Sequence, residues 1–320
     1  MRDVNQISRD RHPISVIVCT LNEETNISAC LRSVGWADQC FVVDAFSTDQ
    51  TVHIARNFGA EVIMHEWKGY SDQKNWALRN LSVRNEWVLF LDADERVSPE
   101  LAMEIQEIVK SAQNKYAGYY IPRRMMFLGR WLKHSWWYPD YNLRLFKRNL
   151  GQFENRLVHE TVVLDGEPGY LISDLIHDDQ RDISTYCGRL NRYSSLEAQE
   201  MYRVLIERRS SQFKPSWRGN WAQRRRALKE QIWYRLPFRP LIRFIWTMIF
   251  RLGFLDGHEG MIFTGLAMIN DWLAQAKFYE LILIRQGQRV SGELTPDLPS
   301  FTKANQVKLS KNSASNRDLL

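Results

Sequence analysis

Short hydrophobic runs alternate with amphipathic segments along the first hundred residues of the chain. The runs are rich in β-branched residues, and they predict four strands within residues 14–20, 40–51, 60–67 and 86–95. The stretches between them, ISACLRSV, TVHIARNFG and SDQKNWALRNLS, have helical spacing, and Asn22 is placed to cap the first helix. Strands that alternate with such helices are typical of βαβ units, so the pattern predicts a parallel sheet.

Acidic side chains follow two of these strands at the point where each strand ends. Asp44 closes the second run, and WVLFLDADE places Asp92, Asp94 and then Glu95 at the end of the fourth. Because open α/β sheets bind ligands at the carboxyl ends of their strands, we expect these acids to face a ligand site. Two carboxylates at positions i and i+2 can share Mg²⁺ or Mn²⁺ with a diphosphate, since these ions prefer oxygen ligands.

The usual backbone cradles for phosphate are absent from the sequence. No GxxxxGK occurs and no GxGxxG follows the first run, which excludes a P-loop and the usual dinucleotide-binding fold. Positive charge then has to come from a metal ion or from side chains such as Lys74 and Arg79 on the intervening helix. Two alternatives stay open. The acids could only cap a strand end, or form a phosphatase Asp-x-Asp pair, although DADER lacks the hydroxyl residue that such sites usually carry two places on.

Beyond residue 100 the alternating pattern ends. A helix, PELAMEIQEIVKSA, is followed by aromatic-rich segments that predict irregular strands and loops, and then by a helical stretch. We expect an amino-terminal tail at 1–13, an α/β domain at 14–185, a helical region at 186–289 and a disordered tail at 290–320.

Composition and charge narrow the class of protein. The formal net charge of +6 is local, because residues 200–251 hold thirteen Lys and Arg against three Asp and Glu. This asymmetry predicts a negatively charged partner for that segment. Cys19, Cys30, Cys40 and Cys187 have no metal-binding spacing, which favours reduced thiols in the cytosol. We find no secretory signal and no run of about 18 uncharged apolar residues that predicts a membrane span.

The segment RLPFRPLIRFIWTMIFRLGFLDG has a polar residue at every fourth position. These residues are Arg235, Arg239, Arg243, Thr247 and Arg251. On a helix that begins near residue 240, they form one polar stripe beside bulky hydrophobic residues, which is typical of a helix lying in a membrane interface. The upstream WRGNWAQRRRALK adds positive charge for anionic head groups. The alternatives are a core helix whose arginines reach solvent and a nucleic-acid surface, for which no recognised module is present.

Four motifs within about 80 residues resemble those of one enzyme family. SVIVCTLNEETNISACLRSV, VVDAFSTDQT, QKNWAL and WVLFLDADE resemble, in order and spacing, family 2 inverting glycosyltransferases of the GT-A fold. FENRLVHE, YCGRLNRYSSLEA and LGFLDGHEG resemble the bacterial branch that includes β-glucosyltransferases of the lipopolysaccharide core. The resemblance covers roughly residues 14–285. It implies an α/β fold with a Rossmann-like, mainly parallel central sheet and a helical, basic carboxy-terminal extension.

The resemblance also implies roles for residues at the strand ends. The residues implied to bind the nucleotide-sugar are Thr20, Leu21, Glu23, Asp44, Lys74, Asp92 and Ala93. Asp44 would accept a hydrogen bond from uracil, and Lys74 would lie near the phosphates. Asp94 would ligate Mg²⁺ or Mn²⁺, with His177 either a third metal ligand or a hydrogen-bonded surface group. Phe46 stands where the family more often has a small or polar residue.

Inverting transfer needs a base that removes the proton of the acceptor hydroxyl. In RLVHETVV, the position of Glu160 matches the acidic motif of the family, so we predict Glu160 as the catalytic base and His159 as its neighbour. Asp178 and Asp179 are the alternative bases. An ordinary turn or sheet surface is the simpler interpretation of the His-Glu pair.

Together these features predict a metal-dependent glycosyltransferase that moves a hexose, with glucose expected, from a UDP-sugar to a lipid-linked saccharide such as lipopolysaccharide core. The expected partners are the nucleotide-sugar donor, a glycolipid acceptor and an anionic membrane surface, and not nucleic acid. The expected location is peripheral, at the cytoplasmic face of the inner (plasma) membrane. The alternatives are a polyprenyl-linked or exopolysaccharide precursor as acceptor, or a non-catalytic scaffold that binds nucleotide-sugar or lipid.

Overall fold

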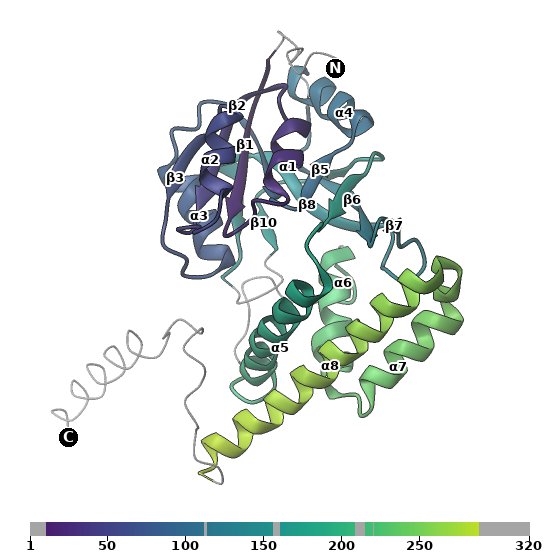
Figure 1. The fold of residues 1–320 in the computed structure, drawn as a ribbon. Helices are drawn as coiled ribbons and strands as arrows, with labels where there is room; N and C mark the ends of the chain where they lie inside the picture. Colours follow the sequence, from purple (N-terminus) through teal and green to yellow (C-terminus); the bar gives the residue numbers. More distant parts are fainter. Residues whose placement is uncertain (1–10, 112–113, 156–160, 209–214, 220, 288–320) are drawn as a thin grey trace, which may run out of the picture. The chain divides into compact units, whose positions relative to one another are not determined.

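The computed structural model describes residues 11–111, 114–155, 161–208, 215–219 and 221–287 (Figure 1). The strands are β1 His12–Thr20, β2 Ala37–Asp44, β3 Glu61–Met64, β4 Trp87–Asp92, β5 Glu95–Val97, β6 Gly118–Phe127, β7 Arg130–Trp131, β8 Asp140–Lys147, β9 Gly151–Phe153, β10 Val162–Leu164, β11 Pro168–Tyr170 and β12 Leu175–Asp178. The α-helices are α1 Ile27–Ser33, α2 Thr51–Asn57, α3 Tyr70–Asn80, α4 Pro99–Lys110, α5 Ile183–Leu205, α6 Trp221–Ala227, α7 Arg239–Ile245 and α8 Gly257–Arg285.

One large mixed sheet organises the α/β part of the chain. Its strands run in the order β3-β2-β1-β4-β8-β6-β12-β5, with β7 and β11 paired to β6. The first four are parallel, as the βαβ pattern predicts, and β8 joins β4 in antiparallel direction. Because β1 lies between β2 and β4, Thr20 pairs with Asp44 and Cys19 with Asp92, which brings the predicted strand ends to one edge of the sheet.

Hydrophobic side chains cover both faces of this sheet. Along β1, Val16 and Val18 belong to the cluster packed against α1 and α4, whereas Ile17 belongs to the cluster packed against α3. This division follows from the strand geometry, since successive side chains point to opposite faces. All three side chains are fully buried. The predicted α/β class with a mainly parallel sheet and a helical carboxy-terminal region is confirmed.

The carboxy-terminal helices are tied to the β6–β7 region by polar contacts. The Asp256 carboxylate accepts hydrogen bonds from the backbone N–H groups of His134 (2.9 Å) and Ser135 (2.6 Å). Arg130 donates to the carbonyl of Leu255 at 3.1 Å. The chain divides into two units, residues 1–281 and 282–320, and all contacts described here lie within the first. The predicted boundary at residue 185 stays a prediction.

Two local expectations can be compared with the structure. The first helix begins later than expected, because Asn22 adopts a positive φ of 55° and its side chain accepts from Thr48 N–H at 2.8 Å, while Asn26 stands at the helix cap. The prediction of Asn22 as the cap is therefore wrong. Over the residues that the structure describes, no helix combines the length and apolarity needed to cross a membrane.

Candidate active site

The carboxylate of Asp44 is held at the end of β2 by short hydrogen bonds from hydroxyl groups. The side chain is fully buried, and it accepts from Thr20 Oγ1 at 2.8 Å and from Ser47 Oγ at 2.5 Å. The Ser47 backbone N–H donates to the other carboxylate oxygen at 2.7 Å. Thr20 comes from the adjacent end of β1, so the parallel register explains this pairing. The Asp44 carboxylate is therefore fixed in place by the end of β1 and by the loop that follows β2.

The residue directly before Ser47 has an unusual backbone conformation. Phe46 adopts a left-handed φ of 62°, and its ring is exposed. This conformation is unfavourable for a side chain that carries a Cβ, and such strain concentrates at functional sites. The bulky residue noted at this position in the sequence thus projects from the strand-end edge instead of filling the core.

Asp92, at the end of β4, belongs to a network of two acids and three cations. Lys74 Nζ lies 3.2 Å from one carboxylate oxygen, and Arg144 donates to the other at 2.5 Å. The same guanidinium donates to the fully buried Glu95 at 2.7 Å, and Arg123 lies 3.7 Å from Glu95. Burial opposes ionisation of Asp92, but Arg144 and Lys74 outweigh it and hold its pKa well below the usual range. The carboxylate stays ionised at neutral pH.

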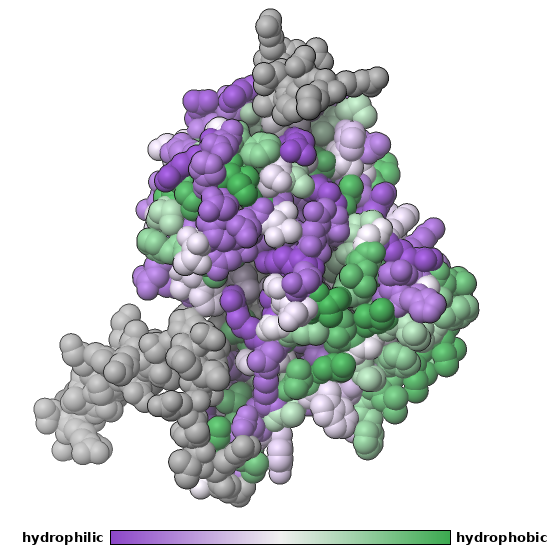
Figure 2. Space-filling model, viewed as in Figure 1, coloured by the Kyte–Doolittle hydropathy of each residue, from purple (hydrophilic) through white to green (hydrophobic). Residues whose placement is uncertain are grey.

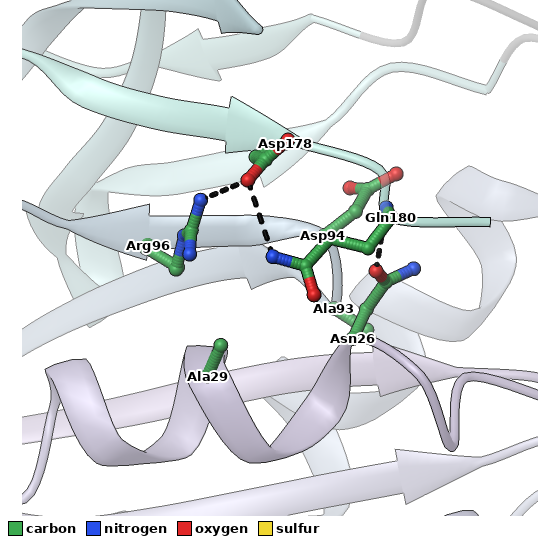
Figure 3. A pocket seen from close by; sticks show the side chains of 7 residues that line it. All are labelled: Asn26, Ala29, Ala93, Asp94, Arg96, Asp178 and Gln180. Carbon is green, nitrogen blue, oxygen red and sulfur yellow. Dashed lines mark hydrogen bonds and ion pairs between the residues drawn. The ribbon is translucent and has the colours of Figure 1, made fainter. Parts of the chain in front are cut away.

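Asp94 lies in the turn between β4 and β5, facing His177 of β12. Figure 3 shows Asp94 in a small hollow lined by Asn26, Ala29, Ala93, Arg96, Asp178 and Gln180. His177 Nδ1 lies 3.5 Å from Asp94 Oδ1, and both atoms are buried without a hydrogen-bond partner. Buried polar atoms of this kind call for an explanation, and a ligand that binds between them is one.

Arginines approach the opposite oxygen of Asp94. Arg181 and Arg189 lie 3.9 Å and 3.7 Å from Asp94 Oδ2, so neither makes a hydrogen bond to it. Both are anchored elsewhere, since Arg181 donates to Asp179 at 2.7 Å and Arg189 pairs with the same carboxylate. Arg181 also donates to Glu23 at 3.0 Å. The strand-end edge therefore carries two guanidinium groups beside the acid, which is a setting suited to a ligand with several negative charges.

Burial raises the pKa of Glu23 to about 8, and the nearby Asp94 carboxylate adds to the effect. The folded protein thus binds this proton more tightly than the unfolded chain does. We expect the free energy of unfolding to fall as pH rises from about 4.5 to about 8, with a slope from this group of at most about 1.4 kcal/mol per pH unit. Urea unfolding of the wild type and Glu23→Gln between pH 5 and pH 8.5, without metal, measures this. Parallel pH curves for the two proteins would contradict the assignment.

Asp94 and His177 present two donor atoms that fit a divalent cation. Among the described residues, no group of three or more His, Cys, Asp or Glu side chains could hold a metal ion. Asp94 Oδ1 and His177 Nδ1, however, are two unpartnered donor atoms at a separation close to that of neighbouring ligands on one ion, roughly 3 Å. Mg²⁺ is commonly held by only one or two carboxylates together with substrate phosphates. The pair therefore suits an ion that arrives with a diphosphate.

Most of the predicted site residues meet at this edge of the sheet. Thr20, Asp44, Lys74, Asp92 and Asp94 lie at or beside the ends of β1, β2 and β4. The other members of the predicted set that lie in the described residues are Leu21, Glu23, Ala93 and His177. Their assigned roles stay predictions.

The predicted base cannot be placed. Glu160 and its neighbour His159 lie outside the described residues. Both alternative bases are engaged with cations, Asp178 with Arg96 and Asp179 with Arg181 and Arg189.

Three arginines at the site were not predicted from the sequence: Arg144, Arg181 and Arg189. Arg144 lies inside a strand of irregular pattern, and no local spacing marks it. Arg189 lies within YCGRLNRYSSLEA, a motif whose resemblance to the family was noted without assigning the arginine a role.

Comparison with known proteins gives a consistent family. A family model described as glycosyl transferase family 2 matches residues 15–162. A Rickettsia typhi protein named as an uncharacterized glycosyltransferase is 31% identical over 281 residues, which span 84% of this chain and 88% of the relative. LpsC of Rhizobium meliloti, named as a lipopolysaccharide core biosynthesis glycosyltransferase, is 26% identical over 291 residues, spanning 88% of this chain and 98% of LpsC.

Among solved structures, S. aureus TarS 1–349 in complex with UDP-GlcNAc is similar at a TM-score of 0.44 and 16% identity, covering 88% of this chain and 93% of TarS. The family match begins at β1 and takes in the ends of β1, β2 and β4, where Thr20, Asp44 and Asp92 meet. The Rickettsia relative is similar over 84% of this chain, well beyond the residues that the family model matches. Together, these two findings show that the chain is a glycosyltransferase and belongs to glycosyl transferase family 2.

Proposed function

We propose that this glycosyltransferase moves a hexose, with glucose the expected sugar, from a UDP-sugar to a lipid-linked saccharide such as lipopolysaccharide core. The observation that carries the proposal is the arrangement around Asp94. An unpartnered carboxylate oxygen and an unpartnered imidazole nitrogen face each other beside two arginines, at the strand-end edge of the sheet. That combination suits a metal-bound diphosphate better than a neutral ligand.

The donor would lie across the ends of β2, β1 and β4. Asp44, fixed by Thr20 and Ser47, would accept a hydrogen bond from the uracil ring at the β2 end. Asp94 and His177 would hold Mg²⁺ or Mn²⁺ at the β4 end, where the ion neutralises charge on the leaving diphosphate. Arg181 and Arg189 would add positive charge next to the phosphates. Lys74, whose ammonium lies 3.2 Å from Asp92, keeps that acid ionised and in place.

The acceptor would attack the anomeric carbon directly, with inversion. Glu160 is proposed as the base that takes the proton of the acceptor hydroxyl as the new bond forms. The name of LpsC supports a saccharide of the lipopolysaccharide core as the acceptor class. An acceptor of this kind is lipid-linked, which would place the enzyme at the cytoplasmic face of the membrane.

Calorimetric titration with UDP, GDP and ADP, each with and without Mn²⁺, tests the donor site. We expect UDP to bind tightest and to lose most of its affinity when Mn²⁺ is omitted. Preference for GDP or ADP would overturn the proposed donor while leaving the family intact. If none of the three nucleotides binds, the alternative of a non-catalytic scaffold replaces the proposal.

A further inference from the structure

The polar stripe of α7 faces the interior of the protein. Arg239 is 1% exposed, and Thr247, in the π-helical turn η4 (Trp246–Phe250) that continues α7, is also buried. Arg243 donates to Asp271 of α8 at 3.1 Å. Arg239 lies over the ring of Tyr234 and donates to Met201 Sδ at 3.1 Å. The stripe therefore fastens α7 to the rest of the protein.

The hydrophobic side of α7 consequently points outward. The exposed residues on α7 and η4 are Leu241, Ile242, Ile245, Trp246, Ile249 and Phe250, and those that follow are Leu252, Phe254, Leu255, Met261 and Ile262. We call these eleven residues the apolar face. Figure 2 shows hydrophobic residues, in green, gathered over this part of the molecule. An apolar surface of this extent is rare on a protein that meets only water.

This orientation decides between two interpretations of the segment. A core helix whose arginines reach solvent would bury its hydrophobic residues and expose the arginines. The structure shows the reverse, since Arg239 is buried while Ile249 and Phe250 are 60% and 67% exposed. The core interpretation is therefore wrong, and the apolar face needs another partner.

Charge indicates what that partner is. Residues 235–255 contain four arginines and no Asp or Glu. Arg239 is buried and Arg243 pairs with Asp271, so the charge near the surface comes from the exposed Arg235 and the half-buried Arg251. Arg251 lies over the ring of the exposed Trp137 at 4.7 Å, and Arg130 donates to the carbonyl of Leu255. Guanidinium groups and tryptophan thus lie at the margin of the apolar face. Hydrophobic residues bordered by arginine and tryptophan match the boundary of a bilayer, where acyl chains meet anionic head groups.

We propose that the apolar face docks on a lipid bilayer that carries anionic head groups, with Ile249 and Phe250 among the residues entering the acyl boundary. This proposal deepens the proposed function and rests on it for the lipid-linked acceptor. No covalent change is involved. Docking would hold the strand-end site beside a membrane from which such an acceptor is presented.

Vesicle flotation of the full chain tests the docking. Vesicles of phosphatidylcholine alone and of equal parts phosphatidylcholine and phosphatidylglycerol are compared at low salt. We expect the wild type to float with the anionic vesicles and less with the neutral ones. Ile249→Glu/Phe250→Glu should lower the partition coefficient by about tenfold or more, because it removes apolar contact and adds like charge. The control, Met103→Glu/Ile172→Glu, changes two exposed hydrophobic residues outside the apolar face and should float as the wild type does.

Three results would overturn the docking proposal. The wild type could fail to float with anionic vesicles, or the two double variants could float equally well. Alternatively, no protein would float, and the chain would form an oligomer that only Ile249→Glu/Phe250→Glu dissociates. The last would assign the apolar face to a second copy of the chain. UDP titration of the same samples keeps the two proposals separate, because the strand-end site should bind UDP equally in all three proteins. If the wild type did not bind UDP, the proposed function would be contradicted, whereas the docking proposal would still be decided by flotation.

Discussion

Asp94→Asn is expected to abolish Mn²⁺-dependent UDP binding and to lower turnover by about a thousandfold. The change keeps the size of the side chain but removes the negative charge that Arg181 and Arg189 approach, 3.9 Å and 3.7 Å away. It also removes the carboxylate that faces His177. Calorimetric titration of UDP with and without Mn²⁺, followed by steady-state assays with UDP-sugars, measures both effects.

Asp38→Asn is the matched control for this experiment. Asp38 is an acid at the other end of the sheet, paired with Arg84 on the surface, and its loss should leave UDP binding unchanged. If Asp94→Asn still bound UDP in a Mn²⁺-dependent way with normal affinity, the metal would have to bind elsewhere. The assignment of Asp94 and His177 as its ligands would then be wrong.

Arg144→Met is expected to lower the free energy of unfolding by about 3–5 kcal/mol, because it removes the cation that is hydrogen-bonded to both Asp92 and the buried Glu95. Arg144 donates to both Asp92 and Glu95, and Glu95 is fully buried. Urea unfolding at neutral pH measures the loss. Because the folded pKa of Asp92 is held low, the contribution of this pairing is present above the usual pKa of an aspartate and declines as pH falls below it. The difference between wild type and variant should therefore shrink in acid.

The double variant Arg144→Met/Glu95→Gln separates charge from shape. Removing the buried charge together with its partner should restore part of the lost stability, since the remaining cost is only imperfect packing and hydrogen bonding. Arg84→Met, which removes an exposed arginine, controls for the substitution itself and should have little effect. A double variant less stable than the single one would show that the network acts through packing and not through charge.

The amino-terminal half of the sheet could be predicted from the sequence because its signals are local. Each parallel strand is a short hydrophobic run, and two of them, β2 and β4, end directly at an acid, Asp44 and Asp92. The site cations are a different case. Arg144, Arg181 and Arg189 reach the strand-end edge from segments more than 45 residues further along the chain, and their positions depend on tertiary packing that no periodicity encodes.

The basic segment shows a second limit of sequence patterns. The four-residue spacing of Arg239, Arg243 and Thr247 correctly indicates a helix with one polar side. A hydrophobic periodicity shows that a helix has a polar and a hydrophobic side, but it does not show which side packs against the rest of the protein. Here a buried arginine and the Arg243–Asp271 pair decide the question, and Asp271 lies on another helix.

The order β2-β1-β4 gives the strand-end site a fixed length. Asp44 and Asp92 end strands that are separated only by β1, and neighbouring strands lie about 4.8 Å apart, so the two acids stand roughly 10 Å from each other. In the proposed donor site, the uracil would lie at the Asp44 end of this span and the diphosphate at the β4 end. A nucleotide with one phosphate fewer would then reach only one end of this span at a time. Selection by length would then be a property of the backbone, independent of which side chains recognise the sugar.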